Sequence, residues 1–169
     1  MSITYNAEEI YDMGIQIERN GQAFYQAAAE SAAEKDVKEL LTDLAHWEKA
    51  HIDLFKELKK QIPSDVQTDP GLDLDQQQLL YLKAAADTHV FTKNADPVAL
   101  AKTCKGPIDV LEIALNFEKD SVVLYTAMKD LVPESLGKET IDKLIQEEIS
   151  HISMIHEWME RFCGEQNSS

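Results

Sequence analysis

The second half of this chain repeats the first at an offset of one hundred residues. Most matches under this shift preserve only apolar character, as a duplicated pair of amphipathic helices would. The identical positions differ from these because they are mainly Glu, His and Tyr. Among them are Glu18 with Glu118, Tyr25 with Tyr125, Glu48 with Glu148, and His51 with His151; the identical apolar pairs are Ala27 with Ala127, Leu44 with Leu144, and Ile52 with Ile152. A repeat that keeps polar residues while its apolar residues drift indicates that those polar residues share one task.

Four long segments carry apolar residues at helical spacing. Asn6 followed by Glu9 is typical of a capped helix start, and Pro107 suits the first turn of a helix. Gly164 would be a natural C-terminal stop for the last segment. We expect helices at about residues 7–32, 36–61, 107–132 and 138–163.

The stretch between the second and third helices, residues 62–106, is too long for a structureless connection in a compact domain. Within it we expect a helix from Leu72 to Val90 and a shorter one that begins at Asp96-Pro97 and ends near Lys105. Short connections make the two helices of each half antiparallel neighbours. Residues 1–169 are therefore expected to form a single all-α domain. The expected architecture is a four-helix bundle of two antiparallel helix hairpins with a long, partly helical crossover between helices 2 and 3.

The chain is strongly acidic, with 31 Asp and Glu against 16 Lys and Arg and a formal net charge of −15. That balance argues against nucleic acid and anionic membranes as partners, since both select basic surfaces. No window resembles a membrane span or a secretory signal. Cys104 and Cys163 are far apart in the sequence and are expected to be reduced thiols. We therefore expect a cytoplasmic protein.

Glu and His three residues apart on a helix share one face. A single Glu-x-x-His pair on an acidic helix is usually solvated, with a chance histidine, but two pairs at a common offset favour another interpretation. If the hairpins turn their apolar faces together, four carboxylates meet in the bundle centre and repel one another. Two divalent metal ions would balance them, and glutamate and histidine without thiolate favour iron or manganese. The expected metal ligands are Glu18, Glu48, His51, Glu118, Glu148 and His151.

The other polar and aromatic candidates are given lesser roles. Tyr25 and Tyr125 follow Glu18 and Glu118 by seven residues, two turns along the same stripe. They are expected either to pack only or also to hydrogen-bond a metal-bound carboxylate. We interpret the remaining residues as surface or packing histidines (His46, His89 and His156), a solvent-facing carboxylate (Glu147), and tryptophans packed outside the site (Trp47 and Trp158).

At these residues the sequence resembles the ferritin-like di-iron superfamily, and within it the rubrerythrin-type domain. The matching elements are Glu18 with Phe24-Tyr25, Glu48-x-x-His51, Glu118 with Tyr125, and Glu148-x-x-His151. The resemblance spans about residues 7–163. It implies a carboxylate-bridged di-iron centre, in which manganese or zinc could substitute for iron. In that centre Glu48 and Glu148 would bridge both ions, Glu18 and Glu118 would be terminal ligands, and His51 and His151 would bind one ion each.

Two departures from rubrerythrins bear on activity. Rubrerythrins proper carry a C-terminal rubredoxin module with two Cys-x-x-Cys pairs, whereas this sequence ends FCGEQNSS without one. Electrons are therefore expected from a separate donor, such as a rubredoxin-like protein. Rubrerythrins also have an extra glutamate one turn after the third-helix ligand, where this chain has Ser121, with Gly21 as its first-half counterpart. The ligand set is thus similar to the symmetric four-Glu, two-His kind of other branches of the superfamily.

The resemblance implies an oxidoreductase that reduces hydrogen peroxide or dioxygen at the di-iron site. Two alternatives stay open: ferroxidation linked to iron handling, and a metal-stabilised helical binding module without catalysis. We also expect the chain to form a homodimer.

Overall fold

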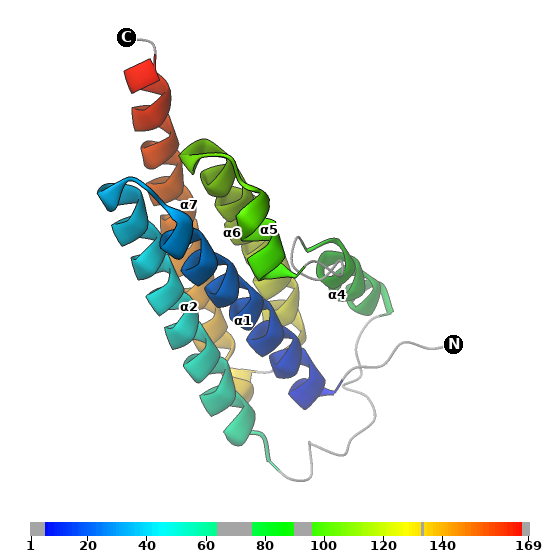
Figure 1. The fold of residues 1–169 in the computed structure, drawn as a ribbon. Coiled ribbons are helices and arrows are strands. Elements are labelled where there is room, and N and C mark those ends of the chain that lie inside the picture. The colour runs from blue at the N-terminus through cyan, green and yellow to red at the C-terminus, as the bar shows by residue number, and fades with distance from the viewer. Residues whose placement is uncertain (1–5, 64–75, 90–95, 133, 167–169) are drawn as a thin grey trace.

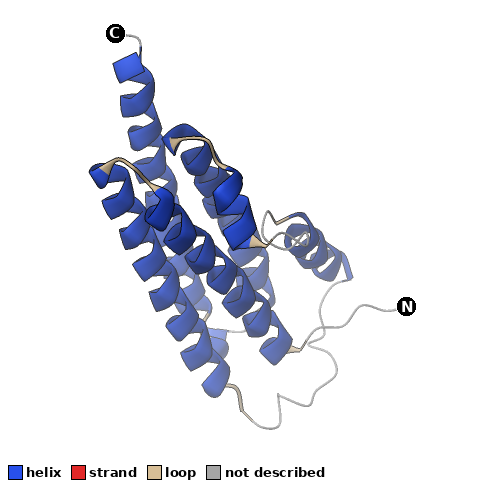
Figure 2. Ribbon diagram, viewed as in Figure 1, coloured by secondary structure: helices blue, strands red, loops and turns tan. Residues whose placement is uncertain are grey.

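Helices make up almost all of the described part of the chain. The structure, a computed structural model, describes residues 6–63, 76–89, 96–132 and 134–166. Its elements are α1 (Ala7–Ser31), α2 (Lys35–Lys60), α4 (Gln76–Thr88), α5 (Pro97–Thr103), α6 (Pro107–Leu131), the short 3-10 helix η1 (Glu134–Leu136) and α7 (Lys138–Gln166). Those residues contain no strand (Figure 2), which confirms the all-α prediction.

Two antiparallel helix pairs form the bundle (Figure 1). Helix α1 packs along α2, and α6 packs along α7, each pair joined by a short connection. The crossover places α4 against α6 and α5 against α1, so its helices brace the outside of both hairpins. Of the described helices, none is long and apolar enough to cross a membrane.

The helix boundaries follow local chemistry at most ends. The side chain of Asn6 accepts a hydrogen bond from the backbone N–H of Glu9, whose side chain accepts one from the backbone N–H of Asn6. Asp96 caps α5 through the backbone N–H groups of Val98 and Ala99. Both arrangements satisfy donors that a helix start leaves unpaired.

Three predicted boundaries need correction or lie outside the described residues. Gly164 does not end the last helix, because α7 continues to Gln166; glycine weakens a helix interior but does not by itself stop it. The short crossover helix ends at Thr103, before Lys105, and the longer one is seen from Gln76 to Thr88. Its predicted outer turns, at residues 72–75 and 90, lie outside the described residues.

The interior of the bundle is apolar apart from one polar group of residues. Aromatic and aliphatic side chains from α1, α2, α6 and α7 make up most of the core. Among the described residues, the buried polar or charged ones are Glu18, Glu48, His51, His89, Glu118, Ser121, Glu148 and His151. Burying charged groups is costly unless they have partners, so this polar group is the unusual feature of the fold.

Gly21 lets α1 approach the aromatic ring of Phe117 on α6. A Cβ atom at Gly21 would lie 2.4 Å from Cζ of Phe117, whose side chain is fully buried. Such a contact is too short for any side chain, and the packed ring has little room to move. The glycine therefore fixes how closely the two hairpins meet, next to Glu118.

We expect Gly21→Ala to lower the free energy of unfolding by about 1–3 kcal/mol, the usual cost of overpacking a core. This exceeds the gain of up to about 1 kcal/mol that alanine brings to a helix interior. Urea denaturation measures the difference. Gly164→Ala is the matched control, because a Cβ there meets nothing within 4 Å, and it should leave stability unchanged or raise it. Equal effects of the two substitutions would contradict this account of the packing.

Candidate metal centre

The six predicted ligands converge in the middle of the bundle. Helices α1 and α6 each contribute one glutamate, and α2 and α7 each contribute a Glu-x-x-His pair whose members lie one turn apart on the inner face. None of the six side chains belongs to a residue more than 6% exposed. The repeat in the sequence is therefore a repeat in space, with each hairpin supplying two carboxylates and one imidazole.

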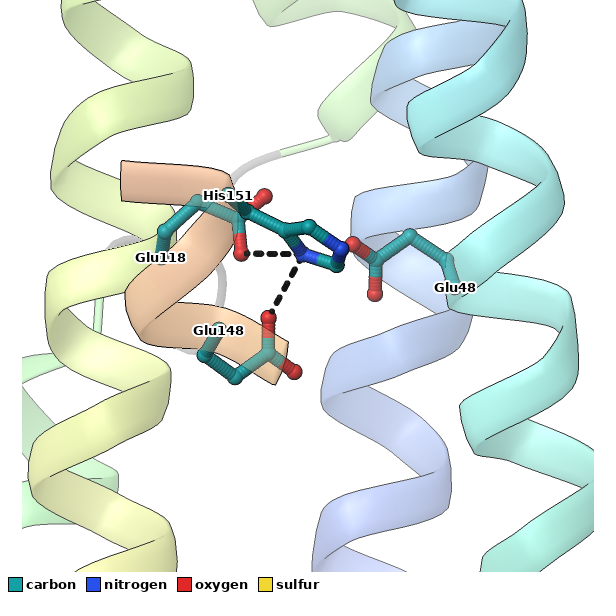
Figure 3. A group of neighbouring side chains, drawn as sticks. All are labelled: Glu48, Glu118, Glu148 and His151. Atoms are coloured by element: carbon teal, nitrogen blue, oxygen red, sulfur yellow. Dashed lines mark hydrogen bonds and ion pairs between the residues drawn. The ribbon is translucent and has the colours of Figure 1, made fainter. Parts of the chain in front are cut away.

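The six residues form two overlapping groups that could each hold a metal ion. One group contains Glu48, Glu118, Glu148 and His151, and the other contains Glu18, Glu48 and His51; within each, one ligand atom per residue lies within 4.8 Å of the others. Glu48 belongs to both groups. Figure 3 shows its carboxylate projecting from α2 toward the side chains of Glu118, Glu148 and His151.

Glu148 lies between the two histidines. Its Oε1 atom is 3.0 Å from Nδ1 of His51, and its Oε2 atom is 3.1 Å from Nδ1 of His151. The outer carboxylates are paired more loosely. Glu18 Oε2 is 3.7 Å from Nδ1 of His51, and Glu118 Oε2 is 3.4 Å from Nδ1 of His151. Glu148 thus contacts both histidines, whereas Glu18 contacts His51 and Glu118 contacts His151.

The centre also contains buried polar atoms that lack a well-aligned hydrogen bond, although two of them, His51 Nδ1 and Glu148 Oε1, lie 3.0 Å apart as an ion pair. Within the described residues, the buried side-chain atoms without a hydrogen-bond partner are Glu18 Oε2, both carboxylate oxygens of Glu48, His51 Nδ1, Glu118 Oε2 and Glu148 Oε1. All belong to predicted ligands. An unsatisfied buried oxygen or nitrogen is expensive, and a cation placed among these atoms would satisfy all of them together. The donor set, carboxylate oxygen with imidazole nitrogen, fits a divalent transition metal.

Burial and crowding perturb the carboxylates in different directions. Burial, together with repulsion from Glu18, raises the pKa of Glu48 well above its usual range. Burial and the neighbouring Glu148 do the same to the pKa of Glu118. For Glu148, burial is outweighed by close contacts with His151 and His51, which hold its pKa below the usual range. Glu48 and Glu118 therefore retain protons that a metal ion would displace.

The histidines carry the compensating positive charge when no cation is present. Burial alone would lower the pKa of His51, but close contact with Glu148 and Glu18 and their negative charge raise it to about 11. Glu118 and Glu148 similarly overcome burial and raise the pKa of His151 to about 9. Protons on these imidazoles occupy the place that metal ions would take.

Each buried tyrosine reaches the terminal carboxylate of the other hairpin. Tyr25 donates from its hydroxyl to Glu118 Oε1 at 2.5 Å, and Tyr125 donates to Glu18 Oε1. Burial, together with the negative charge of the centre, raises both tyrosine pKa values well above the usual range, so the hydroxyls stay protonated and remain donors. Of the two roles weighed for these residues, the structure shows packing together with a hydrogen bond to a candidate ligand.

Two residues beside the centre make contacts that the sequence did not predict, and for Trp47 the prediction was wrong. Trp47 does not pack outside the site: its ring stacks on His151, with centroids 4.7 Å apart and an interplanar angle of 12°. Glu147 is exposed as expected, but its Oε2 atom also lies 3.1 Å from Nε2 of His51. Their signal was available in the repeat, because each immediately precedes a Glu-x-x-His pair.

The remaining histidines lie apart from the ligand groups. His46 and His156 are exposed, as expected. His89, at the end of the longer crossover helix, is fully buried, lies edge-on to Phe117 and has its Nε2 atom 3.3 Å from the hydroxyl of Ser121. Burial lowers the pKa of His89 to about 4, so the imidazole is neutral at pH 7. Ser121, the position where rubrerythrins have an extra glutamate, thus faces a histidine supplied by the crossover.

Comparison with known proteins agrees with this architecture. The family model named Rubrerythrin matches residues 9–99, more than half of the chain. A crystal structure from Thermotoga maritima, described as a ferritin-like diiron-carboxylate protein, shares the fold with a TM-score of 0.71 and 23% sequence identity. The match covers 93% of this chain and 96% of that one. A search of curated proteins finds no match. This chain belongs to the rubrerythrin family.

Proposed function

We propose that this chain is a non-haem di-iron protein that reduces hydrogen peroxide or dioxygen with electrons from a separate donor. The observation that carries the proposal is the set of unsatisfied buried atoms, all of which belong to the six candidate ligands. Family membership supports it, as does the diiron-carboxylate description of the Thermotoga maritima protein.

The residues fit two divalent cations in charge and in chemistry. Four carboxylates carry four negative charges when ionised, which two divalent ions balance while the imidazoles stay neutral. Oxygen and nitrogen donors without thiolate suit iron, and manganese or zinc could bind in its place. When bound, two ferrous ions would supply two electrons and Lewis acidity, and two electrons with two protons convert one hydrogen peroxide to two water molecules.

The protein's own side chains would hold and orient this chemistry. Glu48, which belongs to both candidate groups, and Glu148, which contacts both histidines, would serve both metal positions. The hydroxyls of Tyr25 and Tyr125 would orient the carboxylates of Glu118 and Glu18 through hydrogen bonds. The apolar core around them limits access of bulk water, which strengthens every electrostatic contact inside. The site thus has fixed ligands and a dry environment, two features that favour controlled redox chemistry.

The proposed context is a cytoplasmic homodimer that receives electrons from a rubredoxin-like protein. Within the described residues neither Cys104 nor Cys163 forms a disulfide. Ferroxidation for iron storage would instead need a shell of many subunits, so the mass in solution separates the two proposals. A dimer would favour reduction of peroxide or dioxygen, and a large shell would favour storage.

We expect peroxide or dioxygen to oxidise the anaerobic ferrous protein faster than it oxidises free ferrous ion. His51→Ala should slow this oxidation by at least about tenfold, because removing a metal ligand should cost at least as much as removing a residue that only hydrogen-bonds a ligand. Stopped-flow absorbance measures the rate. His46→Ala is the control, since His46 is an exposed histidine on the same helix, and it should match the wild type. If neither oxidant acts faster on the protein than on free iron, the redox proposal fails. If His51→Ala changes stability without changing the rate, the centre is only structural.

We expect the free energy of unfolding of the chelated, metal-free protein to fall as pH rises above neutrality. The pKa values of His51 and His151 are raised from 6.5 to about 11 and about 9. The stability that such groups contribute is complete below pH 6.5 and is lost as pH rises through 9 and then 11. The raised pKa values of Glu48 and Glu118 act in the same direction, because their contribution decreases as pH rises above 4.5.

Bound metal displaces these protons, so the metal-loaded protein should be the more stable form at pH 7, and by a wider margin at pH 9. Urea unfolding at both pH values, with and without chelator, checks this. Coinciding curves for the chelated and loaded samples would contradict a metal site at these residues.

A further inference from the structure

The residue before each bridging glutamate contacts the histidine of the opposite hairpin. Glu147 precedes Glu148 on α7, and its carboxylate lies 3.1 Å from Nε2 of His51 on α2. Trp47 precedes Glu48 on α2, and its ring stacks on His151 of α7. Positions 47 and 147 are therefore equivalent in the repeat and in space, but they carry different chemistry.

Glu147 is placed to fix the tautomer of His51. The Nδ1 atom of that ring faces the centre, 3.0 Å from Glu148 and 3.7 Å from Glu18. When Nδ1 donates its lone pair to a cation, the ring proton sits on Nε2 and can be donated to Glu147. A carboxylate in this place orients the ring and makes the ligating nitrogen more basic, and losing such a partner typically weakens metal binding by about 10–100-fold.

The partner of His151 cannot do the same. Nδ1 of His151 also faces the centre, toward Glu148 and Glu118. Trp47 holds the ring by stacking, but an indole offers one N–H donor and no acceptor, so it cannot take a hydrogen bond from Nε2. In the part of the chain that the structure describes, no carboxylate other than Glu148 and Glu118 lies within 4.0 Å of His151.

We propose that the two metal positions are unequal: the one that includes His51 binds a divalent cation more tightly and fills first, with Glu147 as the positioning residue. This rests on the metal site of the proposed function and adds an order of loading. The side chain of Glu147 is 62% exposed, so it contacts the ligand from outside the cluster and its replacement leaves no cavity in the core.

Anaerobic titration of the metal-free protein with Co²⁺ alone, against a competing chelator, tests the proposal. The visible absorption of Co²⁺ reports each position as it fills. The wild type should bind in two steps of unequal affinity. Glu147→Gln should weaken the tighter step by about 10–100-fold and leave the weaker step unchanged. Glu157→Gln is the control, since it removes the same charge from an exposed position on the same helix, and it should leave both steps unchanged.

The reciprocal substitution tests the equivalence of the two positions. Trp47→Glu places a carboxylate on α2 where the repeat predicts it can reach Nε2 of His151, and it should tighten the weaker step. An unchanged weaker step would contradict the roles assigned to positions 47 and 147. Equal affinities in the wild type, or equal effects of Glu147→Gln and Glu157→Gln, would overturn the unequal loading while leaving the metal site intact. A wild type that binds no Co²⁺ would overturn the metal site as well.

Discussion

Four glutamates buried at the centre of a helical bundle are the constraint on which the rest of this structure depends. Unneutralised carboxylates in a dry core repel one another and lose their hydration, a cost that hydrophobic packing around them cannot offset by itself. Without metal ions, the protein offsets this cost only in part, because Glu48, Glu118, His51 and His151 have raised pKa values and hold protons. Two divalent cations would match the charge and would also satisfy every buried atom that lacks a hydrogen bond in the described residues. The helices, their glycine contact and their caps position these six side chains.

Neither hairpin completes its half of the centre alone. Each tyrosine hydrogen-bonds a glutamate of the other half, and the residues that precede Glu48 and Glu148 contact the other half's histidine. The four contacts are Tyr25 with Glu118, Tyr125 with Glu18, Glu147 with His51, and Trp47 with His151. A duplicated hairpin therefore gains its supporting contacts only when the two copies meet, which ties assembly of the bundle to assembly of the site. The two halves have the same residue at the tyrosine position, whereas position 47 is Trp and position 147 is Glu.

The sequence predicted the role of a residue mainly when the same residue occurs at the equivalent position of both halves. The six candidate ligands and both tyrosines were found because they are identical under the shift and also lie among apolar residues at helical spacing. Identity alone does not single them out, since Lys38 with Lys138 and Glu57 with Glu157 match as well. Trp47 and Glu147 escaped notice because they differ from each other, although their position beside the pairs was visible. His89 has no counterpart in the repeat, and its burial against Ser121 depends on the path of the crossover, which periodicity does not determine.

Helix starts were predicted well where a side chain caps the backbone, as at Asn6 and Asp96. The last helix was ended too early at Gly164, because glycine there lowers helix propensity without adding a competing contact.

We propose that two metal ions bind in the space among these six side chains. Anomalous X-ray scattering at the iron absorption edge, from crystals of anaerobically iron-loaded protein, tests it most directly. The account predicts two anomalous peaks, one beside Nδ1 of His51 and one beside Nδ1 of His151, with the carboxylates of Glu48 and Glu148 between them. A single peak, or iron bound only elsewhere on the acidic surface, would contradict it.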